Sequence, residues 1–510
     1  MMNSITEAVE EKFPSPRHTK WIIVTLLVYF GLRLLFFATA ISPDIPPDEV
    51  THFGISTIFS KAFLLPDNSP DSYQYGLVTN IPWLYYWLMG KLLVLNFFGI
   101  SDLVFLRLLN IPIAFATVYY VRQLVRLLTA DRLTELLVVV AMTNTLMFSF
   151  LSASVSYDNL ANLLAAMATY YLFAFFISRN GFYLAFSCMS ILAGCLTKTT
   201  FIPLVPLFAL LFVIYEARNI RAHFSEMGAF FKAPGRSGVA VLVGIFVGLL
   251  LNIQLFGGNY LKYQTISPPV EVVLPLEKAM QHRLTARNHI FNLFKEGKIS
   301  VEKAKEMAVQ IKHPGDREDT IGLVENYAYA RQSGFKPLGP APYTAMWILQ
   351  MLSTSFGIKA HIGMPNHGIS FIPLTLLILF VLTAYLVRWR PWDMKWIPTS
   401  LLAVAFGYAA FLIIKINYPN YVDSTDIVLT VAGRYIFPIM GPVYAVSCMY
   451  LMRLFKGEKG RLALAAFTVL VLVYSDFPLF LTKVTPEWYG WLENIREALH
   501  GIAHPPSGAG

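Results

Sequence analysis

The sequence predicts an all-α, polytopic membrane protein, and three observations support this fold class. Of 510 residues, 56% are hydrophobic and only 14% are charged, whereas soluble domains carry roughly 25% charged residues. A mean hydropathy of +0.54 leaves too few charges to cover several soluble cores. Apolar runs of about 20 residues, the length of a membrane-crossing helix, recur along the chain. We therefore expect a bundle of about eleven transmembrane helices.

The first clear span is Trp21–Ile41, after a tail of residues 1–20. Its apolar run is longer than the core of a signal peptide, so we expect it to be retained. The other candidate spans are 105–127, 133–151, 159–177, 182–197, 200–215, 238–256, 371–387, 396–415, 436–454 and 462–482.

Basic residues in the short loops predict the orientation. Alternating the eleven spans brings them to one side with Arg17 and Lys20, and the positive-inside rule makes that side cytoplasmic. The net charge of +9 is then mainly a mark of topology, and we expect no nucleic-acid partner. These loop residues are Arg122, Arg126, Arg132, Arg179, Arg218, Arg221, Lys232, Arg236, Arg388, Arg390, Lys395, Arg453, Lys456, Lys459 and Arg461.

This orientation divides the rest of the chain. Residues 21–256 form an N-terminal transmembrane module with a long first outer loop, 42–104. Residues 257–370 form a large outer helical region, 371–482 a C-terminal transmembrane module, and 483–510 a partly disordered outer tail. The three cysteines, too few for a disulfide framework, and the absence of any Asn-x-Ser/Thr sequon favour a prokaryotic inner membrane.

Three outer segments are expected to be helical without crossing the membrane. Ile81–Phe98 is apolar but rich in Trp and Tyr, and counting it as a span would invert every later loop. We interpret it as an interfacial amphipathic helix. Leu276–Phe294 and Ser300–Ile311 are charged and compatible with helix, and the pattern ends at the Pro314-Gly315 turn.

Two adjacent carboxylates, Asp48 and Glu49, follow the first span within the run Pro46 to Phe53. Prolines and acids also suit the first turn of an ordinary juxtamembrane helix. Together with Asp44, these two carboxylates are crowded where the bilayer meets water. Such crowding tends to raise the pKa of one of the acids, and a raised pKa suits a general base. His52, one turn after Asp48, would orient it or share a divalent metal.

Asp158 and Lys198 should reach the same end of the bundle as Asp48. Asp158, before Asn159, either caps the next helix or positions a substrate. Lys198 lies between two apolar runs, where it either snorkels to the interface or holds a phosphate as a point charge.

Arg434 stands at the outer mouth of a span, where the positive-inside rule gives no reason for a cation. Its guanidinium fork matches a lipid phosphate, and the alternative is a pairing with Asp423 or Asp426. We take Tyr435 as a substrate-binding neighbour. His361 is a further candidate, although its spacing of six from His367 fits no tight metal site.

Arg33 lies in the middle of the first span. A charge there must face protein or water, so we expect it to pair with an acid inside the bundle. The sequence has no P-loop, no HExxH and no CxxC pair, so nucleotide binding and hydrolytic zinc chemistry have no recognisable ligand set.

In order along residues 20–455, these motifs resemble those of the membrane-integral C-type-fold (GT-C) glycosyltransferases. The run Pro47 to Gly54 looks like the Asp-Glu motif of protein O-mannosyltransferases. Ile81 to Leu88 is similar to the Pro-Leu-Tyr-Tyr juxtamembrane helix of aminoarabinose transferases. Gly76-Leu77 stands where Gln-Pro or His-Pro is usual, and the charged insert 277–333 is also a departure.

A bacterial membrane family of unassigned function resembles the chain more closely still. The likeness lies in Pro-x-Asp-Glu-x-x-His, in Asp158, in Leu196 to Lys198 and in Gly433 to Pro438. These motifs, taken together, extend the resemblance over most of the chain.

The resemblance implies transfer of a sugar from a polyprenyl-phosphate donor to a glycan, lipid or protein acceptor at the extracytoplasmic face. Asp48, with Glu49 second, would deprotonate the acceptor hydroxyl, and one displacement would give inversion. Lys198 and Arg434 would stabilise the departing lipid phosphate, with Asp158 positioning acceptor or base. No cofactor is required, and a divalent cation bridging Asp48, His52 and the donor phosphate is optional.

Two other function classes would use the same residues. A transporter or flippase of lipid-linked sugars would carry the anionic headgroup past these charges. Such proteins usually place key polar groups near the bilayer midplane on broken helices, whereas the candidates here gather at span ends. An envelope-assembly scaffold would instead use the large outer loops as binding surfaces, with the acids as helix caps.

Overall fold

A computed structural model describes most of the chain. Every regular element among its described residues is helical, which confirms the all-α fold class. The described ranges are 16–43, 45–217, 230, 232–311, 314–356, 396–427 and 429–483.

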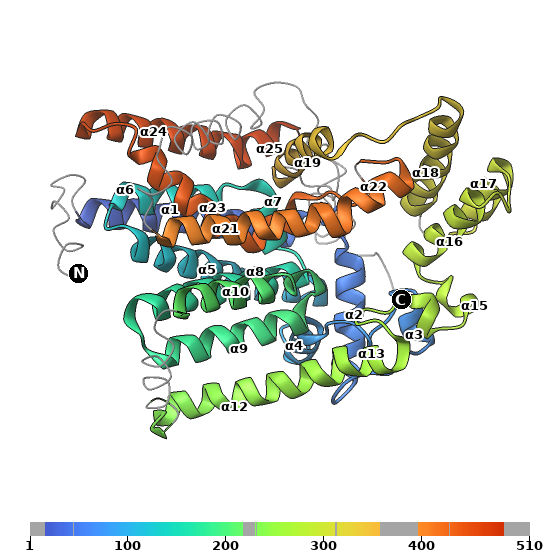
Figure 1. The fold of residues 1–510 in the computed structure, drawn as a ribbon, viewed down its shortest axis with the longest axis horizontal. Coiled ribbons are helices and arrows are strands. Elements are labelled where there is room, and N and C mark those ends of the chain that lie inside the picture. Colours follow the sequence, from blue (N-terminus) through green and yellow to red (C-terminus); the bar gives the residue numbers. More distant parts are fainter. Residues whose placement is uncertain are drawn as a thin grey trace, which may run out of the picture.

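Among the described residues, seven helices are long and apolar enough to cross a membrane, so the chain is a multi-pass membrane protein. Figure 1 labels α1, α5, α8, α10, α12 to α13, α21 to α22 and α23; the short helix η1 (Thr199–Phe201) precedes α10, and η5 (Gly433–Ile436) precedes α23. As membrane spans they run His18–Ala40, Asp102–Leu128, Tyr157–Ser178, Thr199–Glu216, Gly235–Tyr263, Trp396–Ser424 and Gly433–Met452.

The remaining predicted spans differ from straight membrane helices. The span predicted over 133–151 is wrong as a single helix, because α6 (Arg132–Thr143) and α7 (Leu146–Ser152) meet at 65°. Span 182–197 is α9 (Gly181–Thr197), only 17 residues long. Span 462–482 falls on α24 (Glu458–Ser475) and α25 (Phe477–Lys483). Span 371–387, His361, His367 and the tail from 484 lie outside the described residues.

The break between α6 and α7 has a local cause and a partner that stabilises it. Asn144 turns its side-chain amide back to the Val140 carbonyl, 2.9 Å away, which competes with helix continuation. The Thr143 carbonyl accepts from Arg33 Nη2 at 2.6 Å. Arg33 also forms a buried ion pair with Asp476. The predicted pairing of Arg33 with an acid inside the bundle is therefore confirmed.

The first loop contains three helices: α2 (Glu49–Lys61), α3 (Pro70–Tyr73) and α4 (Leu84–Leu93). The expected helix over 81–98 is therefore present but shorter, beginning after Pro82 and Trp83. In Figure 1, α2 runs across the end of the bundle, nearly perpendicular to the long helices. It packs against α4, where the close approach of Gly90 to the Phe59 backbone leaves no room for a Cβ.

The charged insert folds as a helical cap beyond α2, and we call residues 276–332 the cap (Figure 1). The helix predicted over 276–294 is two helices, α15 (Leu276–Ala279) and α16 (Arg283–Lys295). The pattern does not end at Pro314, because α18 (Pro314–Gln332) begins there after α17 (Val301–Val309). Proline suits a first helical turn. The cap has its own apolar core, formed by Ala286, Ile290, Phe291, Ala304, Ile311, Leu323 and Val324.

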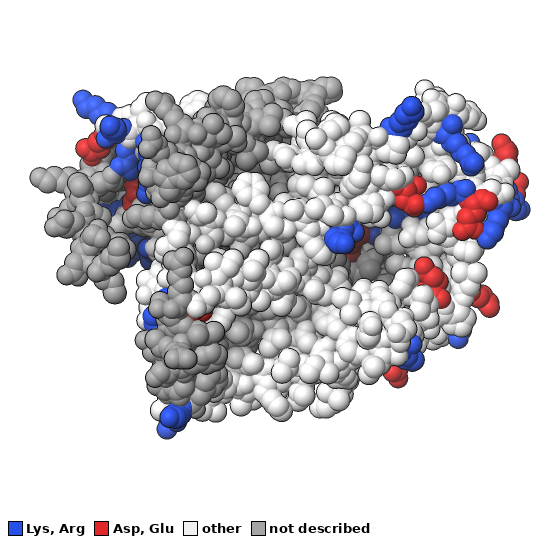
Figure 2. Space-filling model, viewed as in Figure 1, with Lys and Arg blue, Asp and Glu red and all other residues white. Residues whose placement is uncertain are grey.

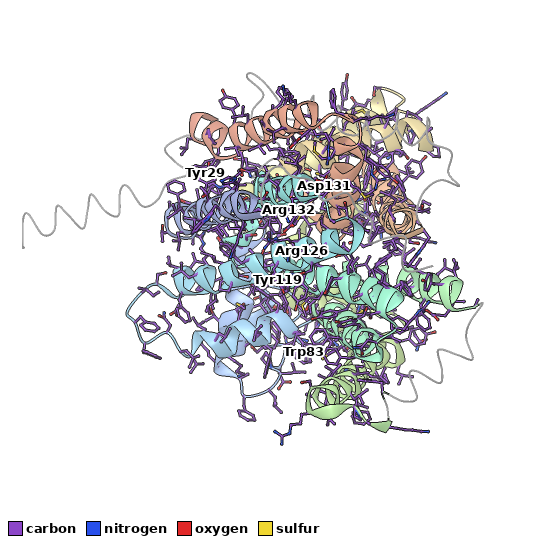
Figure 3. The ribbon with its side chains drawn as sticks, turned by 90° about the vertical axis from the view of Figure 1, so that its left-hand side faces the viewer. Tyr29, Trp83, Tyr119, Arg126, Asp131 and Arg132 are labelled. Carbon is purple, nitrogen blue, oxygen red and sulfur yellow. The ribbon has the colours of Figure 1, made fainter. Side chains whose placement is uncertain are left out.

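The up-and-down course of the spans separates two charged ends. On the face in Figure 2, charged side chains gather at both ends, and the band between is almost free of them. Figure 3 looks onto the end with Arg126, Asp131 and Arg132, where α5 passes to α6. Since helices α1 and α9 end, and α8 and η5 begin, at the opposite end, that end gathers the candidate site residues.

Candidate functional site

Asp48 has an unusual backbone conformation at the start of α2. It is the N-cap residue with φ 58°, in the left-handed region, and its side chain makes no capping hydrogen bond. The other described non-glycine residues with positive φ, Arg179, Gln264 and Thr425, all close helix C-termini, where that conformation is ordinary. Strain of this kind at a helix start is a mark of functional sites, and it leaves the carboxylate free to bind elsewhere.

Two guanidinium groups hold the Asp48 carboxylate. Arg434 Nη2 donates to Oδ2 at 2.5 Å, and Arg283 Nη2 donates to Oδ1. Burial alone would raise the pKa of Asp48, but Arg434 and then Arg283 outweigh it and hold this pKa well below the ordinary 3.8. Asp48 is therefore ionised throughout the neutral range.

A second ion pair, between Lys198 and Asp158, lies beside the first. Ser156, and not Asp158, caps α8 by accepting from the Asp158 amide at 3.2 Å, so the cap interpretation of Asp158 is wrong. Lys198 is only 5% exposed, so it does not snorkel. Arg434 Nη1 lies 3.8 Å from Asp158 Oδ2. The four side chains form one row, Asp48–Arg434–Asp158–Lys198, which we call the charge row. Asp48 is partly exposed, and the other three side chains are buried.

Aromatic rings line the charge row. Lys198 Nζ lies 4.8 Å from the ring centre of Tyr157 and 5.0 Å from that of Tyr435. The Arg434 guanidinium lies 5.3 Å from the Tyr435 ring centre. Such cation–π contacts stabilise cations that have lost their water. Tyr435 thus lies where the sequence expected it. The alternative pairing of Arg434 with Asp423 is wrong, because Asp423 pairs with Lys295.

His52 lies close to Asp48 but bonds elsewhere. Its Nδ1 is 2.8 Å from the Tyr86 hydroxyl, and its buried Nε2 has no hydrogen-bond partner among the described residues. Burial lowers the pKa of His52 to about 4, although Asp48 opposes the shift. The imidazole is therefore neutral at pH 7. Among the described residues, no group of three His, Cys, Asp or Glu side chains is arranged to hold a metal ion.

Glu49 is bound to a residue that the sequence reading missed, Arg107 on α5. Arg107 donates from Nε to Oε1 at 2.8 Å and from Nη2 to Oε2 at 2.5 Å, while its Nη1 reaches the Ala38 and Ile41 carbonyls. The Val155 amide also donates to Glu49, at 2.8 Å. Arg107 stands in an apolar span, so the argument used for Arg33 could have singled it out.

Close packing fixes the position of Arg434. A Cβ on Gly433 would lie 2.3 Å from the Ser355 backbone nitrogen, so only glycine allows α19 (Pro340–Ser355) this close. The Gly433 amide donates to Thr354 Oγ1 at 2.7 Å. The Tyr408 hydroxyl donates to the carbonyls of Thr200, at 3.0 Å, and Tyr435, at 3.1 Å. These contacts hold the turn that carries Arg434 against the turn that carries Lys198.

A cavity of about 500 Å³ lies between the first loop and the cap. Asp48 and Tyr75 line it from the first loop, and Arg283, Ile290 and Asp316 line it from the cap. Arg283 Nη1 donates to Asp316 Oδ1 at 2.8 Å. Nothing in the sequence distinguished Arg283 from the other charges of the insert, because its role depends on the cap folding back over α2.

The cap is seated on the first loop. Gly76 has φ +89°, and the position of its missing Cβ is 3.4 Å from the His282 ring. Beside it, Tyr73, Leu77, Leu274 and Ala279 form a small apolar cluster. The sequence departure at Gly76-Leu77 therefore coincides with the place where the cap docks.

No protein-family profile and no curated protein matches the chain. Among solved structures, it is similar to ArnT from Cupriavidus metallidurans, in the apo state (15% identity, TM-score 0.36) and bound to undecaprenyl phosphate (14%, 0.35). These matches cover 85% of this chain and 78% and 77% of ArnT. It is also similar to the archaeal oligosaccharyltransferase AglB from Archaeoglobus fulgidus in complex with an inhibitory peptide and a dolichol-phosphate. That match has 12% identity and a TM-score of 0.42, and it covers 89% of this chain and 55% of AglB. All three are distant likenesses.

Proposed function

We propose that the protein is a glycosyltransferase of GT-C type. It moves a sugar from a polyprenyl-phosphate donor to a glycan, lipid or protein acceptor at the extracytoplasmic face of a prokaryotic inner membrane. The observation that carries the proposal is the charge row at one end of the spans, with Asp48 also lining the 500 Å³ cavity. One carboxylate open to a cavity and two buried cations are the groups that this transfer needs.

Asp48 is the better candidate for the base. Its side chain is 31% exposed and lines the cavity. Glu49 also borders the cavity, but its side chain is fully buried, and both of its oxygens accept from the buried Arg107. Both oxygens of Asp48 accept too, but one donor, Arg283, is 33% exposed. Glu49 therefore serves to hold the start of α2, and so positions Asp48. His52, with its unpartnered Nε2, is free to donate to or accept from a substrate hydroxyl.

The reaction is a single displacement. The acceptor oxygen attacks the anomeric carbon and gives its proton to Asp48, while the bond from that carbon to the phosphate oxygen breaks. The leaving lipid phosphate becomes more negative, and Lys198 and Arg434 stabilise that charge. Tyr435 and Tyr157 shield both cations from water. One base and one displacement give inversion.

A flippase for lipid-linked sugars is the alternative, and the broken α6–α7 span is the observation that favours it. However, the polar groups at that break are engaged in holding it. Arg33 binds both Asp476 and the Thr143 carbonyl, which leaves this pair committed to the fold.

The test is transfer by the purified protein from a labelled polyprenyl-phosphate sugar to a panel of glycan, lipid and peptide acceptors. Asp48→Asn should lower transfer about 10²- to 10⁴-fold. The matched control is Asp71→Asn, an exposed acid of the same loop. Full transfer by both Asp48→Asn and Glu49→Gln would refute the carboxylate base. Net lipid translocation across vesicles without release of lipid phosphate would replace the enzyme by the flippase.

A further inference from the structure

Each oxygen of Asp48 accepts a hydrogen bond from a different part of the protein. Arg434 binds Oδ2 from the first turn of a span, and Arg283 binds Oδ1 from the first turn of α16 in the cap. A general base must offer an oxygen to the acceptor hydroxyl and must be basic enough to take its proton. With both guanidiniums in place, Asp48 is a weak base.

The two arginines are held very differently. Arg434 is 4% exposed, donates to the Pro47 carbonyl at 3.3 Å and lies near Asp158. Arg283 is 33% exposed and lines the cavity. It already shares its guanidinium with Asp316 of α18. If it leaves Asp48, Arg283 keeps its 2.8 Å hydrogen bond to Asp316. Buried Arg434 would keep only the Pro47 carbonyl at 3.3 Å and Asp158 at 3.8 Å.

The cap can shift without opening the membrane bundle. Its helices pack on their own apolar core. Its described contacts with the rest of the protein include the Arg283–Asp48 pair, the cluster around Leu77, and the His282 ring against Gly76. Lys278 also lies over the Tyr73 ring, Leu429 packs on the cap core, and Lys295 forms an ion pair with Asp423. That ion pair is partly exposed to solvent, where such pairs contribute little.

We propose that the cavity beneath the cap is the acceptor site and that Arg283 is a positioning residue that restrains the base until an acceptor enters. The acceptor hydroxyl takes the place of Arg283 at Oδ1, and the guanidinium stays with Asp316. The proton then passes from the acceptor oxygen to Asp48. This inference rests on the proposed glycosyltransferase function.

The lining also indicates the class of acceptor. Tyr75, Met280 and Ile290 line the same space as Gln281 and Gln310. This combination suits a neutral hydroxylated molecule with an apolar face, such as a sugar ring. The lining also holds four acidic residues against one arginine, Arg283, which disfavours an anionic acceptor; the acids are Asp48, Glu49, Glu277 and Asp316.

Thiol accessibility tests the restraint without any transfer assay. Ala286 is 4% exposed and lines the cavity, so Ala286→Cys should react slowly with a small methanethiosulfonate reagent. Adding Arg283→Gln should speed the reaction by about tenfold or more, since a charged hydrogen bond to the cap is lost. Arg287→Gln, one turn along α16, is the matched control and should leave the rate unchanged. Equal rates with and without Arg283 would overturn the restraint. The protein without the added cysteine gives the background rate at which its native cysteines react.

The pH profile of transfer tests the effect on the base. Arg434, Arg283 and His52 act most strongly on Asp48, with Asp158 and Asp316 behind the arginines. The other charged or titratable groups that interact with Asp48 are Lys198, Arg287, His282, Tyr86 and Tyr157. Removing Arg283 should move the acid limb of kcat/KM to higher pH and change the KM for acceptor more than that for donor. Arg283→Lys should restore part of the native profile. An unshifted limb would refute the role of Arg283, whereas absence of transfer by the unmodified protein would refute the proposed function and leave the thiol result standing.

Discussion

The pair formed by Arg107 and Glu49 gives the sharpest test of how the first loop is held. Arg107→Met removes two hydrogen bonds to Glu49 and two to the carbonyls of Ala38 and Ile41. In this variant Glu49, which is 1% exposed, keeps only the hydrogen bond from the Val155 amide. Breaking a buried pair by removing one partner costs about 3–5 kcal/mol, because the other charge stays buried and uncompensated.

A double-mutant cycle separates the pair from its surroundings. Burial raises the pKa of the Glu49 carboxyl, against the pull of Arg107, so Arg107 offsets only part of the cost of burying this charge. Arg107→Met with Glu49→Gln should therefore be less destabilised than Arg107→Met alone, with a coupling of about 2–3 kcal/mol. Equilibrium unfolding in detergent, followed by tryptophan fluorescence, measures these values.

The matched control is a pair at the opposite end of the bundle. Arg126 is 46% exposed and lies 3.0 Å from Glu135, and Arg126→Met should cost no more than about 1 kcal/mol. Strict additivity in the Arg107–Glu49 cycle, or a loss below about 1 kcal/mol for Arg107→Met, would refute the reasoning. Glu49 would then be available for chemistry rather than committed to the fold.

Three further predictions follow from the site. Buried His52 stays neutral down to pH about 4, whereas the unfolded chain takes up the proton near its ordinary pKa of 6.5. Lowering the pH from 6.5 to 4 should therefore reduce the free energy of unfolding of the unmodified protein by about 3 kcal/mol more than that of the His52→Gln variant. Equilibrium unfolding of both proteins at the two pH values checks this. Gly433→Ala forces a Cβ onto the Ser355 backbone and should cost about 1–3 kcal/mol. Gly322→Ala in α18, which meets open space, should stabilise by about 0.5–1 kcal/mol; the reverse order would contradict the packing argument. Lys198→Met should lower transfer about 10²- to 10³-fold, against no loss for the exposed Lys61→Met; equal activities would remove Lys198 from the phosphate site.

Much of the fold was predictable because the long apolar runs and the placement of charges allow few alternative positions and orientations of the membrane helices. The seven membrane-length helices lie close to the expected ranges, and Asp48, Asp158, Lys198, Arg434 and Tyr435 meet at one end as the alternation of spans requires. The bend within 133–151 was missed because apolar hydropathy continues through Thr143 and Thr145. The signal was Asn144, a residue that bonds its own backbone.

Other parts of the site depend on contacts between distant segments. That Glu49 is fully buried in a pair with Arg107 follows from where Arg107 lies, 58 residues on. That Arg283 reaches Asp48 follows from the folding of an insert 235 residues away. No local pattern in the sequence carries this information. The positive φ of Asp48 is likewise imposed by its surroundings, since aspartate has only a weak preference for that conformation.

The ion pair between Arg33 and Asp476 has a consequence for the order of events during synthesis. The two residues are 443 positions apart, so at the usual rate of translation roughly 20–90 s pass between them. Throughout that interval the first span carries an arginine whose partner does not yet exist. Chains truncated before Asp476 never acquire it. In such chains the Thr143 carbonyl would remain as an acceptor for Arg33, but its buried charge would be uncompensated, so shortened chains should be less stable than the full chain.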